Sequence, residues 1–186
     1  MKLKTLAVGI VMAVATPLAM AEGSGVYVAL DVGQSNFKDI CSGFVGSCSD
    51  TDTAFRGALG YQINQYAGVE GAYVVAGKST ASAPGFSGSA KLTDLQLAVI
   101  GTLPVGGGFS VIGKVGVDRW SSNFTTTTIS PSGSGSSFLW GVGGQFDFNR
   151  SVAIRGQYET RKAGDINTPE GLGNVSMLSI GVVYKF

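Results

Sequence analysis

Histidine is absent from all 186 residues of this chain. Because histidine is the usual general base near neutral pH, a Ser-His-acid hydrolase is disfavoured, and we expect no enzyme. Cysteine occurs only twice, and two thiolates alone do not fill a tetrahedral zinc site. Neither a metal nor another cofactor is therefore expected.

Charge is also scarce, since Asp, Glu, Lys and Arg make up 13% of the chain, about half the usual share. No basic stripe is visible, which argues against a nucleic-acid partner. The first 21 residues are typical of a secretory signal peptide, because Lys2 and Lys4 precede an uncharged run at 6–15 and Ala-Met-Ala follows at 19–21. We expect cleavage there and a single domain at 22–186.

Runs of the roughly 20 apolar residues that a membrane-spanning helix needs are lacking as well. What the chain has instead is alternation with a period of two residues, which indicates strands. In the last segment Leu178, Ile180 and Val182 share an apolar face with Tyr184 and Phe186. That strand alone fits a soluble sandwich as well as the closing strand of a membrane barrel. The eight predicted strands are residues 25–35, 54–64, 66–77, 91–103, 109–120, 137–148, 151–161 and 175–186.

The connections between these strands are long and short in turn. Short turns are predicted at 64–65, 104–108 and 149–150, and long loops at 35–53, 77–90, 121–136 and 162–174. Outer-membrane barrels have short periplasmic turns and longer external loops. The alternation of long and short connections therefore predicts an all-β fold, an eight-stranded antiparallel up-and-down transmembrane β-barrel.

The strand face opposite the apolar one collects the charges. An Arg or Lys that points into lipid near the bilayer midplane costs about 2–4 kcal/mol, so these faces should form the lumen. Opposed charges there should pair, because an unpaired buried charge is costly. The predicted lumenal charge network is Glu70, Lys114, Arg155, Asp31, Arg56, Asp94, Asp118 and Glu159.

One carboxylate is expected at the centre of this network. Glu70, Lys114 and Arg155 each follow a short turn by a few residues, so they should lie at similar depth. We therefore predict that Glu70 is the hub and that Lys114 and Arg155 are its partners. An eight-stranded barrel is just wide enough for side chains to fill, so the network should hold the barrel together and leave little room for conduction.

Three segments resemble the OmpA-type eight-stranded outer-membrane barrels. They are residues 58–70 (ALGYQINQYAGVE), Val26 to Gly33, and residues 177–186 (MLSIGVVYKF). The resemblance implies that Glu70 is a lumenal carboxylate and that Lys114 and Arg155 occupy basic lumenal positions. Ile100 departs from the family pattern, which has a basic residue there. The peptidoglycan-binding domain of full-length members is not expected, since the sequence ends with the barrel.

The resemblance also implies a bacterial outer-membrane location and the partners that go with it. These are outer-membrane lipid or lipopolysaccharide, and the barrel-assembly machinery, for which Tyr184 and Phe186 would form a C-terminal signal. A monomer is expected. Cys41 and Cys48 should form a disulfide within the first long loop, as a cysteine pair in an exported protein usually does.

Two functions from different classes remain open at this point. One is a structural or adhesion-like cell-surface role, with an extracellular ligand bound by the four long loops. The other is a narrow or gated pore for ions or small solutes. Apolar residues in the loops fit either a contact site or packing over the barrel mouth. They are Phe37, Ile40, Phe44, Val45, Phe86, Phe124 and Ile129.

Overall fold

The computed structural model describes residues 24–37, 47–83, 86–126, 132–162 and 174–186. None of these residues belongs to a helix long and apolar enough to cross a membrane. Within the described ranges the chain forms nine strands. They are β1 Gly25–Phe37, β2 Ser47–Ser49, β3 Thr51–Asn64, β4 Ala67–Ala83, β5 Phe86–Gly106, β6 Phe109–Thr126, β7 Ser132–Asp147, β8 Val152–Lys162 and β9 Asn174–Lys185.

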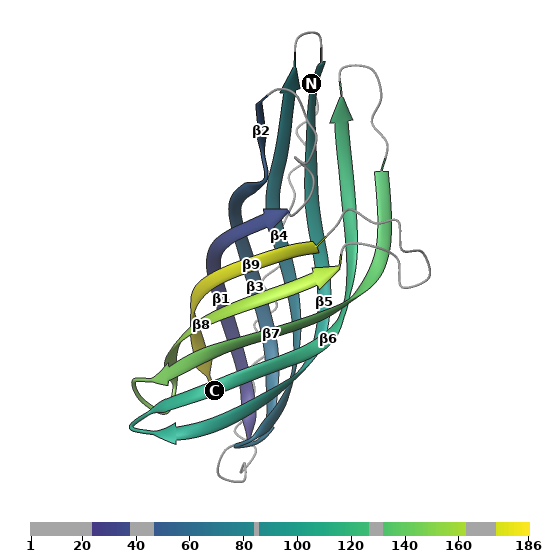
Figure 1. Ribbon diagram of the computed structural model, residues 1–186. Helices are drawn as coiled ribbons and strands as arrows, with labels where there is room; N and C mark the ends of the chain where they lie inside the picture. The colour runs from purple at the N-terminus through teal and green to yellow at the C-terminus, as the bar shows by residue number, and fades with distance from the viewer. Residues whose placement is uncertain (1–23, 38–46, 84–85, 127–131, 163–173) are drawn as a thin grey trace, which may run out of the picture.

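Eight of these strands form one closed antiparallel sheet (Figure 1). Strands β3 to β9 pair in chain order, β1 pairs with β3, and the β1–β9 ladder closes the ring. The fold is the predicted all-β up-and-down barrel. The short strand β2 lies outside the ring, paired with residues 80–82 of β4, and it was not predicted.

The register is staggered from strand to strand. Following paired residues once round the barrel from Tyr27 leads back to β1 at Phe37, ten residues further on. Such a stagger tilts the strands against the barrel axis and sets its diameter. Side chains from different strands can therefore meet in the lumen even where the register does not place their residues opposite each other.

The barrel has two rims. The turn rim is the end where β3–β4, β5–β6 and β7–β8 connect, and the loop rim is the opposite end. Asn64 Oδ1 accepts hydrogen bonds from the Tyr66 and Ala67 amides, and Asn149 Oδ1 does the same for the third turn. The middle turn uses Gly107 and Gly108, whose positive φ angles of 60° and 82° favour glycine. All three short turns are confirmed.

The outward face of the barrel is apolar, as predicted. Leu30, Leu59, Leu95 and Leu178 are between 60% and 72% exposed, which in a soluble protein would be a large unpaired surface. Aromatic side chains lie at both ends of this apolar band, as in outer-membrane barrels. Those near the turn rim are Tyr61, Phe109, Phe146, Phe148, Tyr184 and Phe186, and those near the loop rim are Phe55, Tyr73, Phe138, Trp140 and Tyr158.

The apolar band ends at one level. On six strands the next outward residue towards the loop rim is polar, and we call this set the polar belt. It consists of Gln34, Thr53, Thr93, Arg119, Ser136 and Thr160, each two positions beyond an apolar outward residue. Register pairs Gln34 with Thr53 and Arg119 with Ser136, so belt residues are direct neighbours in these two strand pairs. It marks the boundary of the hydrocarbon region.

Four strands continue far beyond the polar belt. The predicted loops 77–90 and 121–136 are wrong, because β4 runs to Ala83, β5 begins at Phe86, β6 runs to Thr126 and β7 begins at Ser132. Small polar residues there carry no apolar alternation, yet the backbone ladder continues. In Figure 1 the β4–β5 and β6–β7 hairpins rise past the ends of β1, β8 and β9, so one wall of the barrel is taller.

Candidate functional site: the charged lumen

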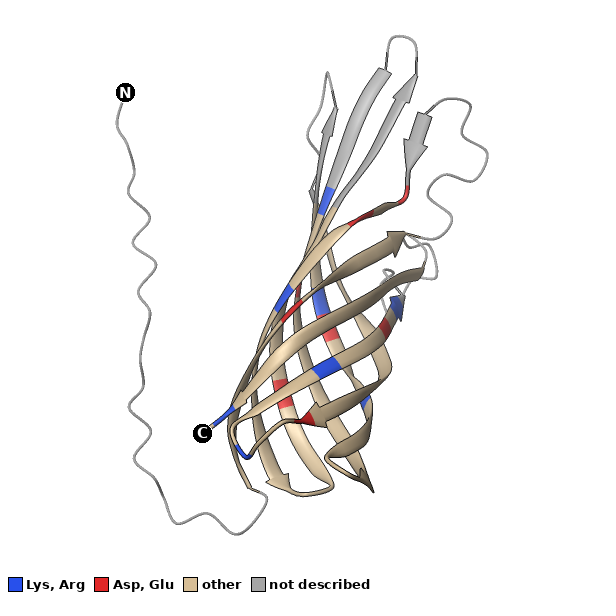
Figure 2. Cartoon of the chain, turned by 90° about the vertical axis from the view of Figure 1, so that its left-hand side faces the viewer, with Lys and Arg blue, Asp and Glu red and all other residues tan. Residues whose placement is uncertain are grey.

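All eight predicted network residues point into the lumen. Each is at most 5% exposed. Figure 2 shows that charged residues occupy only a small part of the strands. They come from six strands and lie between the two rims. The structure divides them into two groups. The central cluster comprises Asp31, Arg56, Glu70, Lys114, Arg155 and Glu159, whereas Asp94 and Asp118 form a separate group with Arg161.

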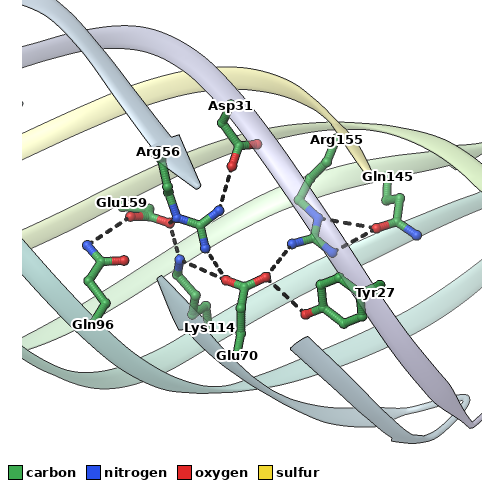
Figure 3. A network of polar contacts seen from close by, with 9 residues as sticks. All are labelled: Tyr27, Asp31, Arg56, Glu70, Gln96, Lys114, Gln145, Arg155 and Glu159. Carbon is green, nitrogen blue, oxygen red and sulfur yellow. Dashed lines mark hydrogen bonds and ion pairs between the residues drawn. The ribbon is translucent and has the colours of Figure 1, made fainter. Parts of the chain in front are cut away.

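Glu70 contacts three bases, more than any other carboxylate in the central cluster (Figure 3). Its Oε2 accepts a hydrogen bond from Arg155 Nη1 at 2.8 Å, and its Oε1 lies 3.6 Å from Lys114 Nζ. Both expected partners are therefore in place. The direct ion pair with Arg56 was not predicted.

Arg56 connects three carboxylates. Its guanidinium contacts Glu70, donates to Asp31 Oδ2 at 2.6 Å and lies 3.5 Å from Glu159. Lys114 forms an ion pair with Glu159 in turn. Three acids thus face three bases, and the cluster is neutral. This balance is what removal of six charges from water requires, since each unpaired one would be strongly destabilising.

Neutral side chains complete the cluster. The Tyr27 hydroxyl donates to Glu70 Oε2 at 2.9 Å, and Gln145 Oε1 accepts hydrogen bonds of 3.2 Å and 3.0 Å from Arg155. The Arg155 guanidinium also lies 5.3 Å from the Tyr27 ring centre, a cation–π distance. Tyr27 can lie across the lumen wall because its paired residue is Gly60, where any side chain would overlap the ring.

The second group lies nearer the loop rim. Arg161 forms an ion pair with Asp94 and lies 3.8 Å from Asp118. One guanidinium therefore serves two buried carboxylates. Sequence reasoning missed Arg161, although it shares the inward parity of Arg155 and Glu159 on the same strand. Asp94 and Asp118 thus lie in the lumen but form ion pairs with Arg161 and not with the central cluster. Asp94 lies four residues beyond Ala98, the residue paired with Glu70, and Asp118 lies four residues beyond Lys114, so both are further from the turn rim.

Apolar side chains fill the lumen beyond these charges. On β5 and β6, Leu92 and Trp120 lie beyond Asp94 and Asp118 and are 4% and 9% exposed. The buried cluster at this level consists of Phe37, Ala54, Val74, Ala76, Leu92, Trp120, Val175 and Met177. Phe37, expected in a loop, belongs to β1 and packs inward. Of the two readings for the loop apolar residues, packing over the barrel mouth is the one that Phe37 follows.

The opposite end of the lumen is open. A cavity of about 530 Å³ lies at the turn rim, with Tyr27, Gln145 and Arg155 at its inner end. Asp147 and Lys185 form a half-exposed ion pair of 2.6 Å at its mouth. The lumen is therefore entered from the turn rim and is blocked in succession by the central cluster, the Arg161 group and the apolar cluster.

The sequence also predicts roles for the C-terminal aromatic residues and for the cysteine pair. Tyr184 and Phe186 point outward at the turn rim with their rings 5.1 Å apart, and the Phe186 amide donates to Val26 O at 3.0 Å. Cys41 lies outside the described residues, and of Cys48 only the backbone is described, so the disulfide stays a prediction. Among the described residues there is no group of three or more side chains of the types that bind metals.

A closed eight-stranded ring with an apolar outer band, aromatic side chains at both its ends and a charged interior defines a transmembrane β-barrel of the outer-membrane type. The chain belongs to the outer membrane protein beta-barrel domain family, whose model matches residues 5–186. The resemblance to OmpA-type barrels and the bacterial outer-membrane location are thereby confirmed.

Known relatives agree with this assignment. The chain is 30% identical over 135 residues to outer membrane protein A of Serratia marcescens, covering 69% of this chain and 38% of that protein. It thus spans well under half the length of that relative. Neisserial surface protein A has the same fold, with a TM-score of 0.65, 19% identity and coverage of 89% of this chain and 100% of that one. Ail, the attachment invasion locus protein of Yersinia pestis, gives a TM-score of 0.60, 20% identity and coverage of 88% and 99%.

Proposed function

We propose that this protein is an adhesion-like cell-surface protein, in which the barrel is the membrane anchor and the tall wall presents the interaction surface. The observation that carries the proposal is the length of β4, β5, β6 and β7. Their paired segments continue beyond the polar belt, where they are of no use for spanning the bilayer. Paired strands hold a surface in a fixed shape at a lower entropy cost than a free loop would.

The lumen supports an anchoring role. Its charges are paired within two groups, and an apolar cluster closes the end nearest the loop rim. A barrel whose interior is occupied in this way resists unfolding and offers no continuous water path. Catalysis is not part of the proposal, because the chain has no histidine to serve as a general base.

The nature of the ligand is open to a direct first test. Ail of Yersinia pestis, which has the same fold, has been crystallised with the heparin analogue sucrose octasulfate. A sulfated saccharide is therefore a reasonable first probe, alongside extracellular-matrix proteins. The choice of a sulfated saccharide rests on the shared fold alone, so the experiment uses both heparin-coated and matrix-protein-coated surfaces.

The test shortens the two hairpins without changing the register of the barrel. Lys78 pairs with Lys91, and Ser122 pairs with Gly133, so residues 79–90 or 123–132 can each be replaced by an Asn-Gly turn. Cells that display the protein should bind to immobilised heparin or matrix proteins, and both shortened variants together should abolish that binding. A control inserts Asn-Gly between Asn149 and Arg150, at the turn rim. Undiminished adhesion by the doubly shortened barrel, shown to be folded, would contradict the proposal.

A narrow or gated pore is the alternative, and the open cavity at the turn rim is the observation that favours it. Planar-bilayer recordings of the refolded protein distinguish the two. We expect no reproducible channels from the wild type. Stable single-channel openings of the wild type, together with unchanged adhesion in the shortened variants, would favour the pore.

A further inference from the structure

Two cations stand on the outer wall where the apolar band ends. Arg119 belongs to the polar belt on β6, and Lys91 lies on the adjacent strand β5, one outward position beyond the belt residue Thr93. Both side chains are exposed. They lie on the tall wall, close to the level at which lipid headgroups replace hydrocarbon.

Among the strand residues whose side chains the structure describes, the carboxylates point inward, and the charged residues of the outward face are Lys91 and Arg119. Neither has an ion-pair partner among the residues whose side chains the structure describes. Among the described side chains, the wall therefore presents a positive patch without a carboxylate at this depth.

Hydroxyl groups lie beside both cations. Thr93 and Ser121, which are paired with each other, lie between Lys91 and Arg119, and Ser136 is paired with Arg119 on its other side. Arginine binds phosphate through two parallel N–H donors, lysine adds a point charge, and hydroxyls donate further hydrogen bonds. Lys91 and Arg119 are offset by about four residues along neighbouring strands, roughly 13 Å, a distance that their long side chains can narrow from both ends.

We propose that Lys91 and Arg119, with the hydroxyls between them, bind the phosphate groups of an outer-leaflet lipid, which in a bacterial outer membrane is lipopolysaccharide. The depth of the patch identifies this occupant. Arg119 is opposite Leu95 in the register, and its outward neighbour along β6 is Val117, which is 49% exposed. Its aliphatic stem therefore lies at the hydrocarbon edge, and its guanidinium lies among headgroups.

A lipid is favoured over a polysaccharide because of this continuity with the apolar band. Acyl chains that pack on Leu95 and Val117 would place their own phosphates at Arg119. A polysaccharide from the medium would instead meet the ends of the hairpins first, further from the membrane. The site is independent of the adhesion proposed above, because it faces the protein's own membrane.

The test measures binding of diphosphorylated lipid A to the protein purified in detergent, by native mass spectrometry over a concentration series. Variants Arg119→Gln and Lys91→Gln should each weaken binding about fivefold, as expected for one cation at an anionic lipid surface. The double variant should weaken it about 25-fold, and Arg119→Lys should lose less than Arg119→Gln because it keeps the charge. The matched control is Arg150→Gln, which removes an exposed arginine at the turn rim and should change nothing.

Further arms identify the ligand group. Dephosphorylated lipid A should bind the wild type as weakly as diphosphorylated lipid A binds the double variant. Equal binding of both lipids, or a double variant that binds like the wild type, would overturn the proposal. Full displacement of lipid A from the wild type by an equal concentration of inorganic phosphate would indicate a free-anion site. A double variant that no longer binds sucrose octasulfate but still binds lipid A would indicate a polysaccharide site. Either result would also overturn it.

Discussion

Replacement of Glu70 by alanine would disturb the central cluster at its most connected carboxylate. Arg56 would keep Asp31 and Glu159, and Lys114 would keep Glu159. Arg155 would lose its ion-pair partner and keep the Gln145 hydrogen bonds and the Tyr27 ring. The cluster would change from neutral to a net charge of +1 inside the lumen.

The size of the effect follows from this unpaired charge. Arg155 is 3% exposed, so water cannot replace the lost carboxylate without entry into the lumen. Removal of one partner of a buried ion pair typically lowers the free energy of unfolding by about 3–5 kcal/mol. Glu70→Gln keeps the shape and one acceptor, so we expect about 1.5–3 kcal/mol, the contribution of a hydrogen bond to a charged group.

Two further variants separate charge from packing. In Glu70→Gln with Arg155→Gln the cluster is neutral again, so the double variant should be at least about 0.5 kcal/mol more stable than the two single effects combined would give. Asp147→Asn is the matched control, because it breaks a carboxylate–lysine pair whose side chains are 31% and 35% exposed. A solvated pair of this kind contributes about 0–1 kcal/mol.

The assay is reversible urea unfolding in lipid vesicles, followed by tryptophan fluorescence. Trp120 lies in the lumen and Trp140 faces lipid, so the two report on different sides of the wall. The expected order of stability is wild type, Asp147→Asn, Glu70→Gln and Glu70→Ala. If Glu70→Ala unfolds within about 1 kcal/mol of Asp147→Asn, the lumen is solvated, and the argument from a dry charge cluster fails.

Three other outcomes can be checked with similar means. Arg161→Gln should lower the free energy of unfolding by about 3–5 kcal/mol because it leaves two carboxylates without a cation, whereas Asp94→Asn should be nearly neutral since one acid remains for the arginine. Gly60→Val should prevent folding, because its side chain would overlap the Tyr27 ring, whereas Gly113→Val, which enters open space, should leave heat-modified gel mobility unchanged. The protein should fold only in detergent or lipid, with strand-dominated circular dichroism, and a soluble monodisperse protein without detergent would contradict the lipid-facing band.

The barrel could be predicted from the sequence because lipid imposes a simple rule on it. Within the bilayer the outward face must be apolar, so the alternation of Leu95, Leu97 and Val99 predicts that their side chains point outward. Glu70 and Arg155 could be paired in advance because both are inward and near a short turn. Beyond the polar belt the rule lapses, and strands made of Ser, Gly and Thr give no period to detect. The prediction of loops failed there for that reason.

Contacts between side chains across the lumen were harder to predict than whether a side chain points inward or outward. Arg56 meets Glu70 although the register places Glu70 opposite Gly60, four residues away along β3. Long side chains and a staggered ring decide such pairs, and neither is visible in one strand at a time. The contact of Tyr27 with Glu70 could not be predicted, because it depends on the absence of a side chain at Gly60 beneath the ring.

The β1–β9 ladder has a consequence for how the barrel is made. It joins residues 27–37 to residues 175–185, so the seam between the first and last strands has the longest sequence separation of any pairing in the ring. Until it forms, β1 and β9 each present a row of unpaired amides and carbonyls, which hydrocarbon cannot solvate. A partly built sheet is therefore not a stable intermediate in the bilayer. Insertion must either carry all eight strands at once or proceed while another sheet edge temporarily pairs with both ends.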